Sequence, residues 1–114
     1  MAIQQFCLAL DLVDNEALMA EYKTHHQSVW PEVIQSIKDA GIRLLNIYCL
    51  GNRLFMIIEA DETFSFEKKA MMDASNEKVQ EWEQLMWKFQ QALPWAKKGE
   101  KWMLMEKIFE LPCE

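Results

Sequence analysis

The stretch of residues 42–60, IRLLNIYCLGNRLFMIIEA, decides the fold class. Two short runs within it, Ile42–Leu50 and Leu54–Ala60, are rich in branched and aromatic residues, which favour β-strands. The residues between them, Gly51-Asn52-Arg53, are typical of a hairpin turn. This stretch therefore predicts two antiparallel strands joined by a three-residue turn.

Strands are also predicted near both ends of the chain. Residues 3–13 alternate between apolar and other side chains, and this period of two indicates a strand with one covered face. Residues 102–111 are the last strand candidate. The side chains expected on the covered face of the first strand are Phe6, Leu8, Leu10 and Leu12.

The apolar spacing becomes helical between these strands. From Ala17 to Ala40 apolar and aromatic residues recur at intervals of three and four, which is the pattern of an amphipathic helix. Pro31 disfavours helical geometry at the residue before it, so we expect a kink or a break there, and Gly41 is the natural end. A second helical region runs from about residue 64 to residue 93, with an interruption expected at Ser75-Asn76.

The predicted order is β-α-β-β-α-β, which is typical of an α+β ferredoxin-like fold: a four-stranded antiparallel sheet with helices on one face. Residues 1–114 are expected to form a single domain, because the composition shows no linker. Small domains of this design often cover the open sheet face by forming a homodimer, the dimeric α+β barrel. The aromatic and sulfur side chains of the last strand fit such an interface and fit an ordinary core almost as well. These side chains are Trp102, Met103, Met105 and Phe109.

Composition and charge exclude several classes of protein. With 18 acidic and 12 basic side chains, the net charge of −6 argues against binding to nucleic acid or to a membrane surface. The sequence contains no apolar run long enough for a spanning helix and no signal peptide. Three widely spaced cysteines predict reduced thiols in a cytoplasmic protein, without a metal site. The charged residues 67–69 and the acidic residues between Glu77 and Glu83 are expected on solvent-facing helix surfaces.

The segment Tyr22–Glu32, YKTHHQSVWPE, could carry chemistry. Tyr22 and His26 are four residues apart and share one face of a helix, and Trp30 lies four further on. Histidine can give or take a proton near neutral pH, tyrosine can orient it, and tryptophan packs well against the C–H face of a sugar. The alternative is that Tyr22 and His26 are core polar groups that pack beside Trp82. His25 points elsewhere and is expected to be more exposed.

The pattern Tyr-x3-His-x3-Trp-Pro-Glu, here Tyr22, His26 and Trp30-Pro31-Glu32, resembles the L-rhamnose mutarotase family. The resemblance extends over nearly the whole chain. It implies a ferredoxin-like homodimer that interconverts sugar anomers without a cofactor or metal. It also implies that His26 is the proton donor, that Tyr22 binds the sugar and that Trp82 lines the same pocket. Trp30 is a further possible pocket residue.

The chain departs from the family pattern at two positions. Glu83 follows Trp82 where the family has a second tryptophan, and Leu45 stands where an aromatic pocket residue is expected. These departures leave the identity of the sugar open, and the resemblance leads us to expect L-rhamnose or a related 6-deoxy sugar such as L-fucose. Two other functions stay open: a cofactor-free monooxygenase of the dimeric α+β barrel type, and a sugar-binding module without turnover.

Overall fold

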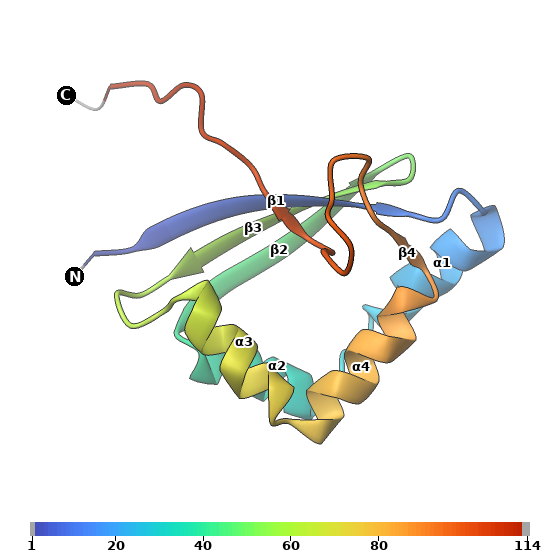
Figure 1. Ribbon diagram of the computed structural model, residues 1–114, viewed down its shortest axis with the longest axis horizontal. Helices are drawn as coiled ribbons and strands as arrows, with labels where there is room; N and C mark the ends of the chain where they lie inside the picture. Colours follow the sequence, from blue (N-terminus) through green and yellow to red (C-terminus); the bar gives the residue numbers. More distant parts are fainter. Residues whose placement is uncertain (1, 113–114) are drawn as a thin grey trace.

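The computed structural model of the protein describes residues 2–112 and follows the predicted alternation of strands and helical regions. The helices lie on one side of an antiparallel sheet, and the C-terminal segment runs away from the body of the molecule (Figure 1). In chain order the elements are β1 (Gln4–Leu12), α1 (Glu16–His25), α2 (Pro31–Asp39), β2 (Ile42–Leu50), β3 (Arg53–Ala60), α3 (Phe66–Ala74), α4 (Glu77–Trp87), β4 (Gln90–Gln91) and β5 (Met103–Leu104).

The sheet places the first strand in the middle. The strand order is β2-β3-β1-β4, and β5 also pairs with β1. β1 lies against β3 along nearly its whole length, while its other edge is shared by β4 at Asp11–Leu12 and by β5 at Leu8–Ala9. Together β4 and β5 take the place of the predicted fourth strand. The arrangement is therefore the expected α+β ferredoxin-like fold.

The β2–β3 hairpin turns in two residues, one fewer than predicted. Leu50 and Arg53 are paired across the ladder, so only Gly51 and Asn52 lie in the turn. Gly51 has a φ of 59°, in the left-handed region that two-residue hairpin turns favour. Arg53 belongs to β3 and donates Nε to Oδ1 of Asp11 on the neighbouring strand at 2.8 Å.

Each predicted helical region consists of two helices. Trp30 has an extended ψ of 136°, as expected for a residue before proline, and Pro31 is the first residue of α2. Between α3 and α4 the Asn76 side chain accepts hydrogen bonds from the backbone N–H groups of Lys78 and Val79. The predicted breaks at Pro31 and at Ser75-Asn76 are confirmed.

The core lies between the sheet and the helices. The alternation predicted for the first strand is confirmed for Leu8, Leu10 and Leu12, all of which are buried. Each fully buried side chain of this size stabilises the fold by roughly 1.5–3 kcal/mol. The largest fully buried side chains are Phe89, Leu10, Leu12 and Leu54.

The prediction of a long last strand is wrong. Within residues 102–111 only the two residues of β5 pair with β1. One further hydrogen bond runs from the Met105 N–H to the Cys7 carbonyl at 2.7 Å. The chain then leaves β1, so Ile108, Phe109 and Leu111 are 89%, 74% and 77% exposed. Continued in the register of β5, residues 105–108 would lie opposite Cys7 to Gln4, an end of β1 that β4 does not occupy, so the strand ends because the chain turns away from that edge.

Two sequence predictions concern cysteines and membrane spans. Cys7 and Cys49 are free thiols, and the third cysteine, Cys113, lies outside the described residues. Within residues 2–112 no helix is both long and apolar enough to cross a membrane.

Candidate active site

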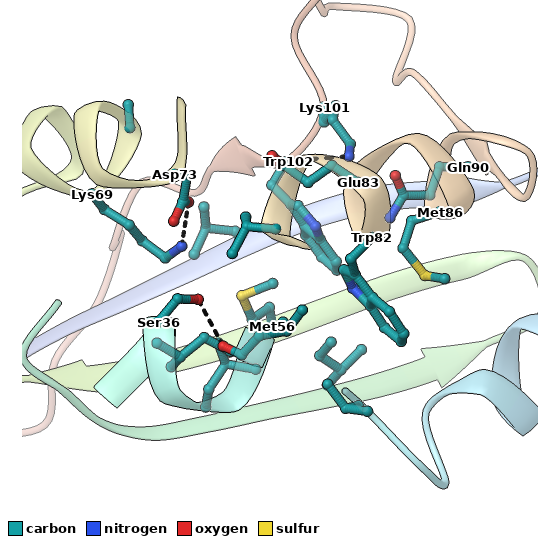
Figure 2. A pocket seen from close by; sticks show the side chains of 18 of the residues that line it. Ser36, Met56, Lys69, Asp73, Trp82, Glu83, Met86, Gln90, Lys101 and Trp102 are labelled. Carbon is teal, nitrogen blue, oxygen red and sulfur yellow. Dashed lines mark hydrogen bonds and ion pairs between the residues drawn. The ribbon is translucent and has the colours of Figure 1, made fainter. Parts of the chain in front are cut away.

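A cavity of about 570 Å³ lies between the sheet and the helices. Its size is within the range of small-molecule sites, about 300–1,000 Å³. In the view of Figure 2, Lys69 and Asp73 lie toward one end, and Trp82 and Gln90 lie toward the other. Apolar side chains form most of the walls between these two ends. They include Leu8, Val33, Leu45, Ile47, Met56, Met86 and Trp102.

Tyr22, His26 and Trp82 meet at one end of the cavity, as the sequence suggested. All three line it. The rings of Tyr22 and His26 are 4.4 Å apart because they lie one helical turn apart on α1, and the ring of Trp82 is 5.6 Å from that of His26. Trp82 is 8% exposed. The three side chains thus form a continuous aromatic wall that contains an imidazole and a phenol.

Trp30 supports this wall from outside the cavity. Its ring packs edge-on against Trp82 with centroids 5.2 Å apart, and it is not among the lining residues. Such a pair contributes about 0.5–1.5 kcal/mol beyond the area that it buries. Trp30 therefore holds the Trp82 ring in place.

One ring nitrogen of His26 is held in a hydrogen bond, and the other has no hydrogen-bond partner among residues 2–112. It caps the end of α1, and its Nδ1 lies 2.9 Å from the backbone carbonyl oxygen of Tyr22. Since a carbonyl only accepts, Nδ1 carries the hydrogen and Nε2 holds the lone pair of the neutral ring. Burial lowers the pKa of His26, the hydrogen bond to Tyr22 opposes this, and nearby His25 lowers it further. The ring is consequently neutral at pH 7.

Tyr22 keeps its hydrogen at neutral pH. Burial raises the pKa of the phenol, and a hydrogen bond from Gln90 opposes this shift, because it favours the ionised form. Gln90 Nε2 lies 3.5 Å from the Tyr22 hydroxyl oxygen. The Tyr22 hydroxyl is therefore a neutral hydrogen-bond donor in the cavity.

The expectation that His25 is exposed is wrong. Its side chain is 30% exposed and lies 3.6 Å from a carboxylate oxygen of Glu21. The His25 ring packs against Phe89 at 5.4 Å and Trp82 at 6.4 Å. The chain that follows α4 lies against this side of α1 and covers it. His25 does not line the cavity.

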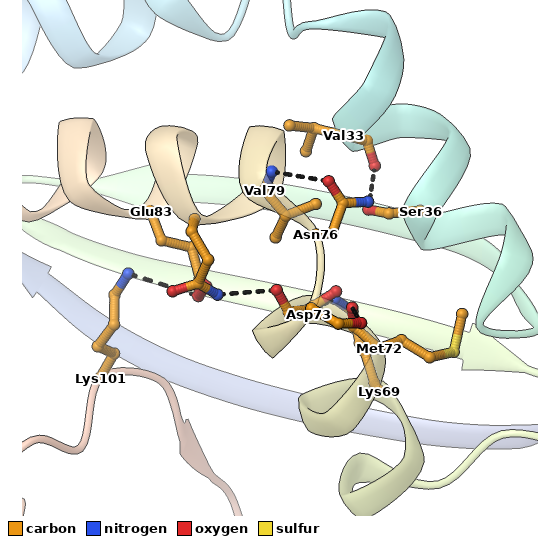
Figure 3. Close-up of polar contacts among 11 residues, drawn as sticks. Val33, Ser36, Lys69, Met72, Asp73, Asn76, Val79, Glu83 and Lys101 are labelled. Carbon is orange, nitrogen blue, oxygen red and sulfur yellow. Dashed lines mark hydrogen bonds and ion pairs between the residues drawn. The ribbon is translucent and has the colours of Figure 1, made fainter.

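Polar side chains from α3, α4 and the segment before β5 also line the cavity, and Figure 3 shows contacts among them. Lys69 pairs with Asp73 one turn along α3, and Gln80 of α4 donates to the Asp73 backbone carbonyl at 2.9 Å and to Glu83 at 3.4 Å. Lys101 Nζ lies 4.0 Å from Glu83 and is only 17% exposed. Burial lowers the pKa of Lys101, and Glu83 opposes this.

The prediction of a solvent-facing side chain is therefore wrong for Lys69, which is 23% exposed, and holds in part for Glu83, which is 41% exposed. Both line the cavity, because α3 and α4 meet over it at the Asn76 break. Sequence reasoning also missed Gln90 and Lys101. The second helical region was predicted to reach residue 93, but α4 ends at Trp87 and Gln90 lies in β4. Lys101 lies in the irregular segment before β5, where no periodic pattern marks an inward side chain.

This arrangement suits proton transfer on a small neutral molecule. A neutral imidazole, a phenol donor and a tryptophan face meet in a largely apolar cavity, and the polar side chains that line it offer further hydrogen-bonding groups. Among residues 2–112 no three His, Cys, Asp or Glu side chains come together as a metal site would require.

Comparisons with known proteins support the same interpretation. Residues 5–111 match the family model described as L-rhamnose mutarotase. Over 113 residues the chain is 44% identical to an L-fucose mutarotase of Xanthomonas campestris pv. campestris, a match that covers 97% of this chain and 90% of that protein.

Solved structures share the fold. The crystal structure of an L-rhamnose mutarotase from Formosa agariphila matches with a TM-score of 0.71 at 22% identity, covering 96% of this chain and 99% of that one. A dimeric ferredoxin-like protein from an uncultured marine organism matches with a TM-score of 0.54 at 15% identity, covering 97% and 93%. From the family model and the Xanthomonas relative, the chain belongs to the L-rhamnose mutarotase family.

Proposed function

We propose that the protein is a mutarotase that interconverts the α and β anomers of a 6-deoxy sugar, with L-fucose as the first candidate. The observation that carries the proposal is His26, a neutral histidine with a free Nε2 in a cavity wall shared with Tyr22 and Trp82. The proposal of L-fucose over L-rhamnose rests on the 44% identical relative, which is an L-fucose mutarotase.

Mutarotation needs one proton to move between two oxygens on the same carbon. Nε2 of neutral His26 accepts the proton of the anomeric hydroxyl, and the imidazolium donates it to the ring oxygen as the bond between that oxygen and the anomeric carbon breaks. The product is the open-chain aldehyde, which rotates, and the reverse transfer closes the ring on its other face. Because both oxygens are bonded to the anomeric carbon, a single group can reach them in turn.

Tyr22 and Trp82 position the sugar for this transfer. The Tyr22 hydroxyl donates a hydrogen bond to a sugar oxygen, and Trp82 presents its face to the C–H groups of the ring. Holding the sugar at hydrogen-bonding distance from His26 lowers the entropic part of the barrier. Since the uncatalysed reaction is already fairly fast, positioning and one acid–base group are sufficient.

Leu45 and Glu83 are proposed to affect the choice of sugar. Both line the cavity and both depart from the residues that the family resemblance leads one to expect. An aliphatic side chain at Leu45 offers apolar contact, whereas Glu83 with Lys101 offers charge-assisted hydrogen bonds to hydroxyl groups.

The test is saturation-transfer NMR of anomer exchange on L-fucose, L-rhamnose and two hexoses that carry a hydroxyl at the sixth carbon. We expect exchange above the spontaneous rate for at least one 6-deoxy sugar, with L-fucose the fastest. No exchange with any of them contradicts the proposal. Sugar-dependent thermal stabilisation without exchange identifies a binding module, and oxygen consumption with a polyphenol identifies a monooxygenase.

We also propose that two copies pair through the sheet face that the helices leave open. This face carries Tyr48 and Phe55, whose rings lie 6.4 Å apart, and Tyr48 is 56% exposed. Pairing would cover these rings together with the apolar residues of the C-terminal segment. Sedimentation velocity should give a dimer for the wild type and a monomer for Phe55→Glu. The control Ile34→Glu, on the exposed side of α2, should stay dimeric, and a monomeric wild type would contradict the proposal.

Two further proposals concern the whole chain. We propose that it acts as one domain, which limited proteolysis tests by yielding one resistant fragment rather than two. A cytoplasmic location is supported by the odd number of cysteines, which suits reduced thiols. Cell fractionation tests this, and recovery outside the cytoplasm would contradict it.

A further inference from the structure

The amide of Gln90 is buried in the cavity on a rigid piece of backbone. Gln90 pairs with Leu12 of β1, and the preceding residue accepts a hydrogen bond from the Val13 N–H at 2.8 Å. The side chain is 6% exposed and lines the cavity beside Tyr22 and Met86. Its neighbour Gln91 on the same strand points outward and is exposed.

The hydrogen bonds of this amide are incomplete within the described part of the chain. Nε2 faces the Tyr22 hydroxyl oxygen at 3.5 Å, whereas Oε1 is buried and accepts no hydrogen bond from residues 2–112. A buried acceptor without a donor is unfavourable, and native proteins rarely keep one without a reason. An apolar side chain of the same length would avoid this cost, so the amide points to a bound hydrogen-bond donor.

Gln90 and Tyr22 together offer one donor and one acceptor side by side. The Tyr22 oxygen accepts from Gln90 and still has its own hydrogen to donate, while Oε1 of Gln90 has its lone pairs free. A hydroxyl group is the ligand that satisfies both, since its oxygen accepts from Tyr22 and its hydrogen is donated to Gln90. A carbonyl, an ether or a fluorine can accept from Tyr22 but cannot donate to Gln90.

We propose that Gln90 is a positioning and specificity-determining residue that accepts a hydrogen bond from one sugar hydroxyl, which Tyr22 holds from the other side. This inference rests on the proposed sugar-binding function. The paired contact fixes the orientation of the sugar ring in the cavity. The orientation in turn sets the distance between the anomeric carbon and His26. It discriminates against sugars that lack a hydroxyl at that position.

The experiment measures binding of L-fucose and of three analogues in which the hydroxyl on the second, third or fourth carbon is replaced by fluorine. Affinities come from chemical-shift titration of isotope-labelled protein, which needs no turnover. The variants are Gln90→Met, which keeps the length and removes the amide, and Gln91→Met, the matched control on the outward side of the strand. Thermal unfolding checks that each variant is folded, and Gln90→Glu, which retains an acceptor, is a second variant.

We expect the wild type to bind one fluorinated analogue roughly three- to tenfold more weakly than L-fucose, the usual effect of one neutral hydrogen bond. Gln90→Met should bind L-fucose more weakly by the same factor and lose the discrimination for that analogue alone. Gln91→Met should behave like the wild type, and Gln90→Glu should still discriminate. The inference is overturned if Gln90→Met keeps the wild-type pattern, or if the wild type binds all analogues equally.

Anomer exchange measured on the same samples separates the two proposals. If Gln90→Met exchanges anomers and keeps the wild-type order of affinities for the fluorinated analogues, the role of Gln90 is overturned and the mutarotase function stands. The expected binding pattern without exchange overturns the mutarotase function and supports the Gln90 contact. If no sugar binds, both proposals are wrong.

Discussion

Replacing Gly41 by alanine should destabilise the protein through a clash that the structure locates. Gly41 connects α2 to β2 and has a φ of +96°, a conformation that side chains other than glycine rarely adopt. A Cβ atom at this position would lie 2.6 Å from Oδ1 of Asp61 and 2.8 Å from Oγ1 of Thr63. Asp61 would have to move, although it accepts hydrogen bonds from the Thr63 backbone N–H and from Arg43.

The cost has two parts. The backbone conformation alone costs about 1–2 kcal/mol for an alanine. Displacing Asp61 weakens the two hydrogen bonds that it accepts from the Thr63 N–H and from Arg43. Each of them stabilises the fold by about 1 kcal/mol. Gly41→Ala should therefore lower the free energy of unfolding by about 3–4 kcal/mol, summed from these contributions.

Gly51 supplies a matched control. It also has a positive φ, +59°, but a Cβ there would meet no atom within 4 Å. Gly51→Ala should thus cost only the backbone contribution, about 1–2 kcal/mol. Urea denaturation of both variants measures the difference, which is the steric part. Equal losses for Gly41→Ala and Gly51→Ala would refute the argument that contact with Asp61 and Thr63 matters.

Three further predictions concern the site and its supports. Anomer exchange should rise with pH as His26 loses its proton, level off above its lowered pKa and stay level to pH 8, because the neutral ring starts the reaction; an exchange rate that falls over this range would contradict the assignment. Asn76→Ala should cost about 1 kcal/mol in urea denaturation by removing the cap of α4, and no loss would contradict the capping role. Asp11→Asn should cost about 1 kcal/mol, since it removes the charge beside half-exposed Arg53; a loss that does not shrink in high salt would contradict this.

Local patterns predicted most of the fold because they act within a few residues. Alternation in the first strand identified the buried Leu8 and Leu10, and the proline at position 31 located the break between α1 and α2. The extent of the last strand depends instead on where the chain turns away from the edge of β1. Apolar composition at Ile108 and Phe109 carries no information about that point, so the sequence predicts too long a strand.

The same distinction applies to the candidate site. Tyr22 and His26 could be placed together from their spacing, because an interval of four residues is one helical turn. Trp82 comes from another helix; the sequence placed it beside Tyr22 and His26 only as a packing partner, and its role in a sugar pocket came from the family resemblance. Gln90 and Lys101 had no local signal, since their inward direction depends on how β4 and the segment before β5 cross the end of the cavity.

The most direct test of the central claim is anomer exchange of L-fucose by His26→Ala, with the neighbouring histidine variant His25→Ala as control. General acid–base catalysis contributes about 10²–10⁴-fold, so loss of the imidazole should bring exchange down to the spontaneous rate. Chemical-shift titration should show that this variant still binds the sugar, and His25→Ala should exchange at close to the wild-type rate. Exchange by His26→Ala as fast as that of the wild type would contradict the account.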